Sequence, residues 1–271
     1  MIAKRLAIAC ASLALGANLA AAARSPRLDK EEMRSAVVVE TIALPSPGEF
    51  FIAVDKKFEP NWTPFVQNTV PPTTTARDDL AFQLGVLLAD AHIAIEAQDG
   101  QAAKNVGRDL IATARKLNVG QNVLARGQNI ADIADKADWR TLREEMDATQ
   151  NDIRLSMQEQ NDDELLVFLM LGSWLRQMEL ASALAEKNPG SGGAALIAQP
   201  TILNHLLDRL ESLPAKVRSR PLAAELLKGL LKIKPLMDQA LHSPLSEESV
   251  RVISATMPGL LSSTKTPETA P

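Results

Sequence analysis

The sequence predicts an all-α protein, an irregular antiparallel helical bundle of about seven or eight helices. Apolar residues make up 46% of the chain and recur mainly at helical spacing. Aromatic residues make up only 3%, and there are only 13 glycines. A β-sandwich or barrel would need more glycine-rich turns and more aromatic and β-branched strand residues. We therefore expect a packed interior formed by helices alone.

The chain opens with a pattern typical of a secretory signal peptide. Lys4 and Arg5 precede an uncharged, alanine-rich stretch, and the next charge is Arg24. A basic start, an apolar middle and small residues before the cleavage point are the three parts of such a leader. We expect cleavage after Ala23, because the stretch is too weakly apolar for a retained membrane anchor. The one cysteine, Cys10, leaves with the leader, so we expect no disulfide or thiolate chemistry in the mature chain.

The leader and the charge also indicate where in the cell the protein is located and which classes of partner are excluded. An alanine-rich leader with two basic residues is typical of bacteria, so a periplasmic or secreted location is expected after cleavage. The formal net charge of −4 provides no basic surface for nucleic acid or anionic lipid. We expect no transmembrane segment once the leader is removed.

The mature chain is expected to contain an arm, a bundle and a tail. Ser46 and Glu49 form a capping-box pair at the start of a short helix in the arm, at about 47–58. The prolines and threonines that follow predict a connector without regular structure. The expected parts are the signal peptide 1–23, the N-terminal arm 24–75, the helical bundle 76–257 with a candidate subdomain break at 189–193, and a flexible C-terminal tail 258–271.

Two helices are expected at the centre of the bundle. The helix at about 75–98 carries two apolar stripes on opposite sides, which predicts that other helices cover both. The helix at about 163–186 is apolar all round in its first half and too short there to span a bilayer, so it is expected to be the buried central helix. The other helices are expected at about 101–117, 121–136, 139–157, 200–212, 221–241 and 246–256.

Most aromatic residues lie in the arm. Five of them lie between positions 50 and 65: Phe51, Phe58, Trp62 and Phe65, together with Phe50. One interpretation is that the rings attach the arm to its own bundle. The other is that they are exposed anchors for a partner protein, because aromatic residues are favoured at interface hot spots. We take the first four as candidate partner-binding residues.

Two pairs of polar residues lie on the central helices. Arg176 and Glu179 follow the apolar part of the central helix, where a charge must find a partner or reach water. They predict either an internal ion-pair network or a site that holds a carboxylate or phosphate group. His92 and Glu96 lie one turn apart on the other helix, and we expect a hydrogen bond between them. One histidine and one carboxylate are too few to bind a metal.

No catalytic signature is recognisable. The sequence contains no nucleophile elbow, phosphate-binding glycine loop, dinucleotide fingerprint or haem-attachment motif. We therefore expect no metal or other cofactor, and an enzyme is not the favoured class. The function predicted from sequence is that of an exported, non-enzymatic interaction or scaffold module of the bacterial cell envelope, acting on an envelope protein. The alternative is a helical bundle that binds a small apolar ligand in a cavity between the two central helices.

The leader provides the first testable prediction. Expression of the full chain in a bacterium should yield a periplasmic protein whose first residue is Arg24, because the small residues before it suit signal peptidase. The intact mass of the purified protein measures this. A protein that retains Lys4 and Arg5 would contradict the assignment.

Overall fold

The computed structural model of the protein describes residues 46–68 and 73–264. All of them belong to one compact unit, and no strand occurs among them, which confirms the predicted all-α class. The predicted leader, the start of the arm and the end of the tail lie outside the described residues. The elements are α2 (Pro47–Phe58), η1 (Thr63–Phe65), α3 (Arg77–Glu96), α4 (Gly100–Lys116), α5 (Gln121–Asp135), α6 (Trp139–Glu159), α7 (Asp163–Lys187), α8 (Ala194–Ile197), α9 (Pro200–Glu211), α10 (Ala215–Arg218), α11 (Pro221–Gln239), α12 (Glu247–Leu261) and η2 (Ser262–Thr264).

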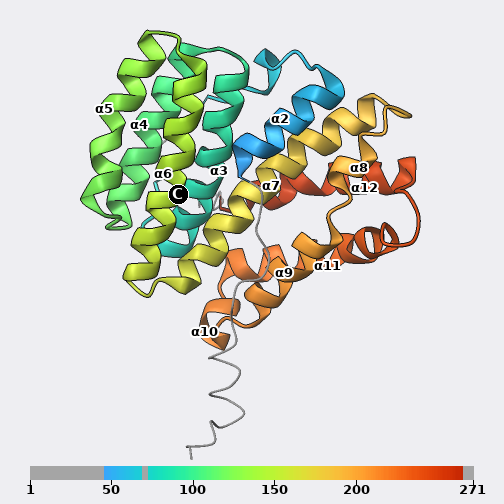
Figure 1. Cartoon of the computed structure of the whole chain (residues 1–271). Coiled ribbons are helices and arrows are strands. Elements are labelled where there is room, and N and C mark those ends of the chain that lie inside the picture. The colour runs from blue at the N-terminus through green and yellow to red at the C-terminus, as the bar shows by residue number, and fades with distance from the viewer. Residues whose placement is uncertain (1–45, 69–72, 265–271) are drawn as a thin grey trace, which may run out of the picture. The chain divides into compact units, whose positions relative to one another are not determined.

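The central helix is α7, as the sequence predicts. Figure 1 shows α3–α6 on one side of it and α9–α12 on the other. Almost every side chain from Leu165 to Ala185 is buried. An apolar surface that runs all round a helix needs neighbours on every side, and α2, α3, α6, α9 and α12 all contact α7. The position of α7 therefore follows from its composition.

The second core helix, α3, is covered on both sides. It packs most extensively on α7, and α4 and α6 cover its other side. Both apolar stripes are buried, with Leu84 and Leu88 on one and Phe82 and Ile93 on the other all at 0% exposure. The helices α4, α5 and α6 then follow as successive neighbours and bring the chain back to α3. The two-stripe pattern thus correctly predicts a helix packed between others.

The two core helices cross in direct backbone contact. A Cβ atom built on Gly85 of α3 would lie 2.0 Å from the carbonyl oxygen of Leu169 on α7. A Cβ atom on Gly172 of α7 would lie 2.0 Å from the carbonyl oxygen of Phe82 on α3. Real non-bonded atoms never approach this closely, so both positions require glycine. No ligand fits between α3 and α7 at this crossing.

Helix ends follow local signals in some places and packing in others. The capping box at α2 forms as predicted: the Ser46 hydroxyl accepts from the Glu49 amide, and the Glu49 carboxylate accepts from the Ser46 amide. The expected end of the last helix at 256 is wrong. α12 continues to Leu261, because Met257 and Leu260 are buried in the core and outweigh the hydrogen bond that Pro258 cannot donate.

The crossing can be tested with one added methyl group. Gly172→Ala should destabilise the protein by about 3 kcal/mol or more, because the new Cβ meets a helix backbone that cannot turn aside. Gly259→Ala on α12 is the matched control, since a Cβ there meets nothing within 4 Å. This control should be neutral or stabilise by up to about 1 kcal/mol. Urea unfolding followed by circular dichroism measures both, and similar midpoints for the two variants would contradict the close crossing.

Candidate functional site

The aromatic residues of the arm pack against their own chain. Phe51 is 0% exposed and Trp62 6% exposed, and their rings meet edge to face with centroids 5.8 Å apart. The Trp62 indole donates a hydrogen bond of 2.9 Å to Asp55. Phe58 and Phe65 are partly exposed. Of the four candidate partner contacts, only these last two offer ring surface to a partner without a rearrangement.

The glycine-rich segment at 189–193 lies against the end of α2. A Cβ atom on Gly193 would lie 2.1 Å from the ring of Phe58, and one on Gly192 would lie 2.8 Å from the amine nitrogen of Lys57. The predicted subdomain break is therefore a contact point between the arm and the turn that follows α7. Its glycines allow the Phe58 ring to approach the backbone closely.

Arg176 connects three parts of the chain. Its Nε donates to Asp90 on α3 at 2.7 Å, Nη1 donates to Glu179 one turn away, and Nη2 donates to the carbonyl oxygen of Phe65 at 2.8 Å. The arginine is 3% exposed and Asp90 is 6% exposed. The predicted internal ion-pair network is present, and it also holds the arm onto α7.

Burial governs the charges of this network. It raises the pKa of Asp90 above its ordinary value, although the adjacent guanidinium opposes the change. Burial also disfavours the charged form of Arg176, but Asp90 and Glu179 outweigh it and raise the pKa of the guanidinium. The arginine therefore stays charged with its three donor nitrogens occupied by its own chain. To bind an external anion it would have to give up one of these contacts.

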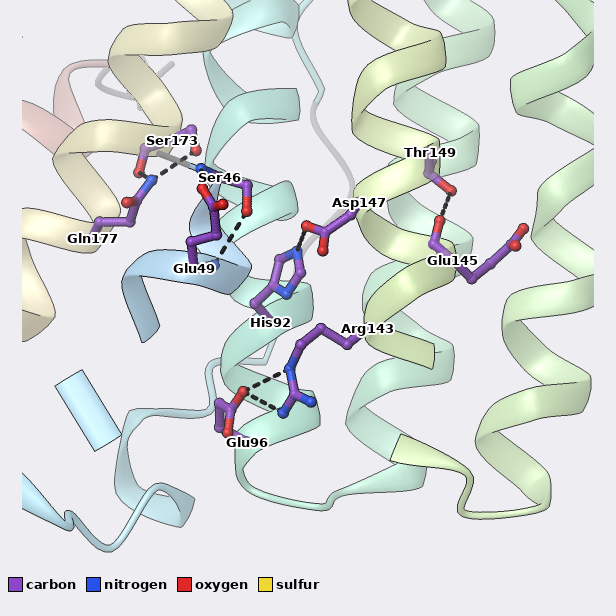
Figure 2. A network of polar contacts seen from close by, with 10 residues as sticks. All are labelled: Ser46, Glu49, His92, Glu96, Arg143, Glu145, Asp147, Thr149, Ser173 and Gln177. Carbon is purple, nitrogen blue, oxygen red and sulfur yellow. Dashed lines mark hydrogen bonds and ion pairs between the residues drawn. The ribbon is translucent and has the colours of Figure 1, made fainter. Parts of the chain in front are cut away.

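His92 and Glu96 do not bond to each other, which corrects the sequence expectation. Each turns to a residue of α6 instead, as Figure 2 shows. Both Nε and Nη2 of Arg143 donate to one oxygen of Glu96, at 3.1 and 2.6 Å. Nε2 of His92 lies 3.5 Å from Oδ1 of Asp147. The helical spacing is compatible with a contact, but Glu96 bonds Arg143 of α6 instead, and His92 faces Asp147 without a hydrogen bond.

The His92 ring is fully buried and has no hydrogen bond. Neither of its nitrogens has a partner among the described residues, and the same holds for the facing oxygen of Asp147. Burial, helped by the positive charge of Arg143, lowers the pKa of His92 to about 3. Burial raises the pKa of Asp147. The imidazole is therefore neutral at ordinary pH.

A cleft at one end of the bundle was not foreseen from the sequence. Its volume is about 1120 Å³, and the first turns of α3, α7 and α11 form its walls. It is open to solvent. The residues that line it are Ala76, Arg77, Asp78, Asp79, Asn161, Asp162, Asp163, Glu164, Leu165, Arg220, Pro221, Leu222 and Ser263.

Acidic residues outnumber basic ones in the cleft. Its two arginines are already paired: Arg77 lies 2.6 Å from Asp162, and Arg220 lies 3.3 Å from the buried Asp78. Burial raises the pKa of Asp79, and a hydrogen bond from Thr74 opposes this shift. The cleft therefore carries a net negative charge once its ion pairs are counted.

Three carboxylates of the cleft remain without an ion pair among the described residues. Asp79 is partly buried and accepts a hydrogen bond from Thr74, whereas Asp163 and Glu164 are exposed in the first turn of α7. Acidic residues are common at this position because they complement the helix dipole, so their presence in the sequence is no signal of a site. Only the fold shows that they face a cleft.

Comparisons with known protein families, with curated proteins and with solved structures give no match. Within residues 46–68 and 73–264, no cluster of His, Cys, Asp and Glu side chains is arranged to hold a metal ion. In the same ranges, no helix combines the length and the apolar character that crossing a membrane requires.

The Arg176 network can be tested by removing its cation. Arg176→Met should cost about 3 to 5 kcal/mol of unfolding free energy, because Asp90 is left buried without its partner. Adding Asp90→Leu should recover a large part of this loss. Arg140→Met is the control, since Arg140 pairs with Glu144 on the surface and should contribute less than about 0.5 kcal/mol. Urea unfolding of the wild type and the three variants measures these unfolding free energies. A loss below about 1 kcal/mol for Arg176→Met would contradict the structural role.

Proposed function

We propose that the protein is an exported helical module of the bacterial cell envelope that binds a basic segment of a partner protein in the cleft between α3, α7 and α11. The leader-like start supports export, and the absence of cysteine after Ala23 suits a chain whose stability rests on packing. The observation that carries the proposal is the cleft itself, whose wall holds two exposed acidic residues without an ion pair, Asp163 and Glu164.

The other candidate contacts support an interaction role less well. The arm rings Phe51 and Trp62 are buried against their own chain, and Arg176 has its donors occupied. The cleft, in contrast, offers open volume and uncompensated charge. A partner can enter it without displacing any of the described residues.

The size and charge of the cleft indicate the kind of partner. Pockets that enclose a small molecule measure roughly 300 to 1000 Å³ and are mostly apolar. This cleft is larger, open to solvent and bordered by charged groups, which suits a length of polypeptide better. Its excess of carboxylates favours lysine or arginine side chains, through ion pairs that strengthen at low salt.

The alternative, a small apolar ligand between the two core helices, receives no support from the packing. The backbones of α3 and α7 touch at Gly85 and Gly172, and the side chains on either side of this crossing are buried against each other. A ligand there would have to separate the two helices that make the largest contact in the bundle.

The cleft can be tested with tetralysine as the probe. The variant Asp163→Asn/Glu164→Gln should bind tetralysine at least about tenfold more weakly than the wild type in calorimetric titration at low salt, because the two unpaired carboxylates are lost. The variant Glu247→Gln/Glu248→Gln is matched, since it neutralises two exposed acids in the first turn of another helix, α12. It should bind like the wild type. Equal weakening in both variants, or in neither, would count against the cleft.

A further inference from the structure

The first turn of α2 sits directly on the His92 ring. A Cβ atom built on Gly48 would lie 3.0 Å from Cε1 of the ring and 3.2 Å from Nδ1. The ring has no exposed surface. Figure 2 shows it between the start of α2, marked by Ser46 and Glu49, and Asp147 of α6. His92 thus occupies the place where the N-terminal arm meets the bundle.

The side chains at this contact, His92 and Asp147, carry polar atoms but make no hydrogen bond through the atoms that face each other. Among the described residues, neither ring nitrogen nor Oδ1 of Asp147 has a hydrogen-bond partner, although all three atoms are buried, and an unpartnered buried polar atom is destabilising. The 3.5 Å between Nε2 and Oδ1 is too long for a good hydrogen bond. The side chains therefore pack closely here, although these polar atoms are left without hydrogen bonds.

The charged groups around the ring do not favour protonation of His92 in the closed state. On α6, Arg143 opposes a positive charge on His92, and Asp147 is the one nearby acid. On α2, Glu49 is engaged in the capping box with Ser46. On α3 itself, Glu96 is bonded by Arg143. The buried α3 acid Asp90 is held by Arg176 of α7, and no charge from α4 acts on the ring. A charged imidazole would need water, and the ring has no exposed surface while α2 covers it.

We propose that His92 and Asp147 form a proton-sensitive latch that holds α2 closed on α3 and α6 while the imidazole is neutral and releases it when the imidazole takes up a proton. The device concerns the arm and not the cleft, so it stands independently of the proposed function. Opening would uncover the inner face of α2, which carries the buried Phe50, Phe51 and Val54.

The direction of the response follows from proton linkage. The closed state holds the pKa of His92 at about 3, whereas an opened, hydrated ring has its ordinary value of 6.5. The open state therefore binds more protons between these values, and the closed state loses stability relative to the open state progressively as the pH falls from about 6.5 towards 3. Burial raises the pKa of Asp147 in the closed state, which favours closure at still lower pH. The response is consequently steepest above the range in which Asp147 titrates.

Amide hydrogen exchange of the mature protein at pH 7, 6 and 5 tests the latch, with rates corrected for intrinsic pH dependence. One proton per opening predicts that corrected exchange in residues 47–58 rises about 25-fold from pH 7 to pH 5, while exchange in α9 stays level. His92→Phe keeps a planar ring and removes the titration, so its exchange in α2 should not respond to pH. His242→Phe, at an exposed histidine, should behave like the wild type.

Two results would overturn the proposal: a wild type whose α2 exchange does not change with pH, or a His92→Phe variant that keeps the wild-type response. If His92→Phe does not fold, nuclear magnetic resonance of the wild type with isotope-labelled histidine measures the protonation state of His92 instead. A His92 ring that stays neutral at pH 5.5 supports the latch, and one that titrates near 6.5 while α2 remains protected refutes it.

Discussion

The close crossing of α3 and α7 is the constraint on which the rest of the structure depends. Because Gly85 and Gly172 carry no side chain, the two backbones touch, and dispersion contacts accumulate along both helices on either side of the crossing. Each helix is then apolar enough to require cover on its other sides. The helices α4 and α6 cover α3, and α9 and α12 cover α7.

The arm is built onto this core by contacts of different kinds. Near its start, α2 rests on His92 through shape, since Gly48 leaves room for the ring. In its middle, the Phe51 and Trp62 rings enter the apolar interior. At η1, Arg176 bonds a backbone carbonyl of the arm while it also pairs with α3. Opening at α2 affects the first of these contacts and uncovers Phe51 of the second, but it leaves the anchor at Phe65 in place.

Local patterns predicted what local physics determines. The two-stripe pattern of α3, the all-round apolar character of α7 and the capping box at Ser46 were each readable from residues a few positions apart, and each was confirmed. The partners of His92 and Glu96 could not be predicted from the sequence, because they lie on α6. Neither spacing nor residue type indicates which helix will face α3. The cleft was missed for the same reason: its acids follow the ordinary preference for helix starts, and only the fold brings three such starts together.

The hydrogen bond from Arg176 to the carbonyl of Phe65 joins residues 111 positions apart. A polypeptide that appears from its N-terminus onward exposes the aromatic segment long before α7 exists to receive it. During that interval the rings have no native surface to cover them, and they are open to chaperones or to other nascent chains. The late arrival of α7 thus sets a period of vulnerability in biogenesis, whose length depends on how fast the intervening four helices emerge.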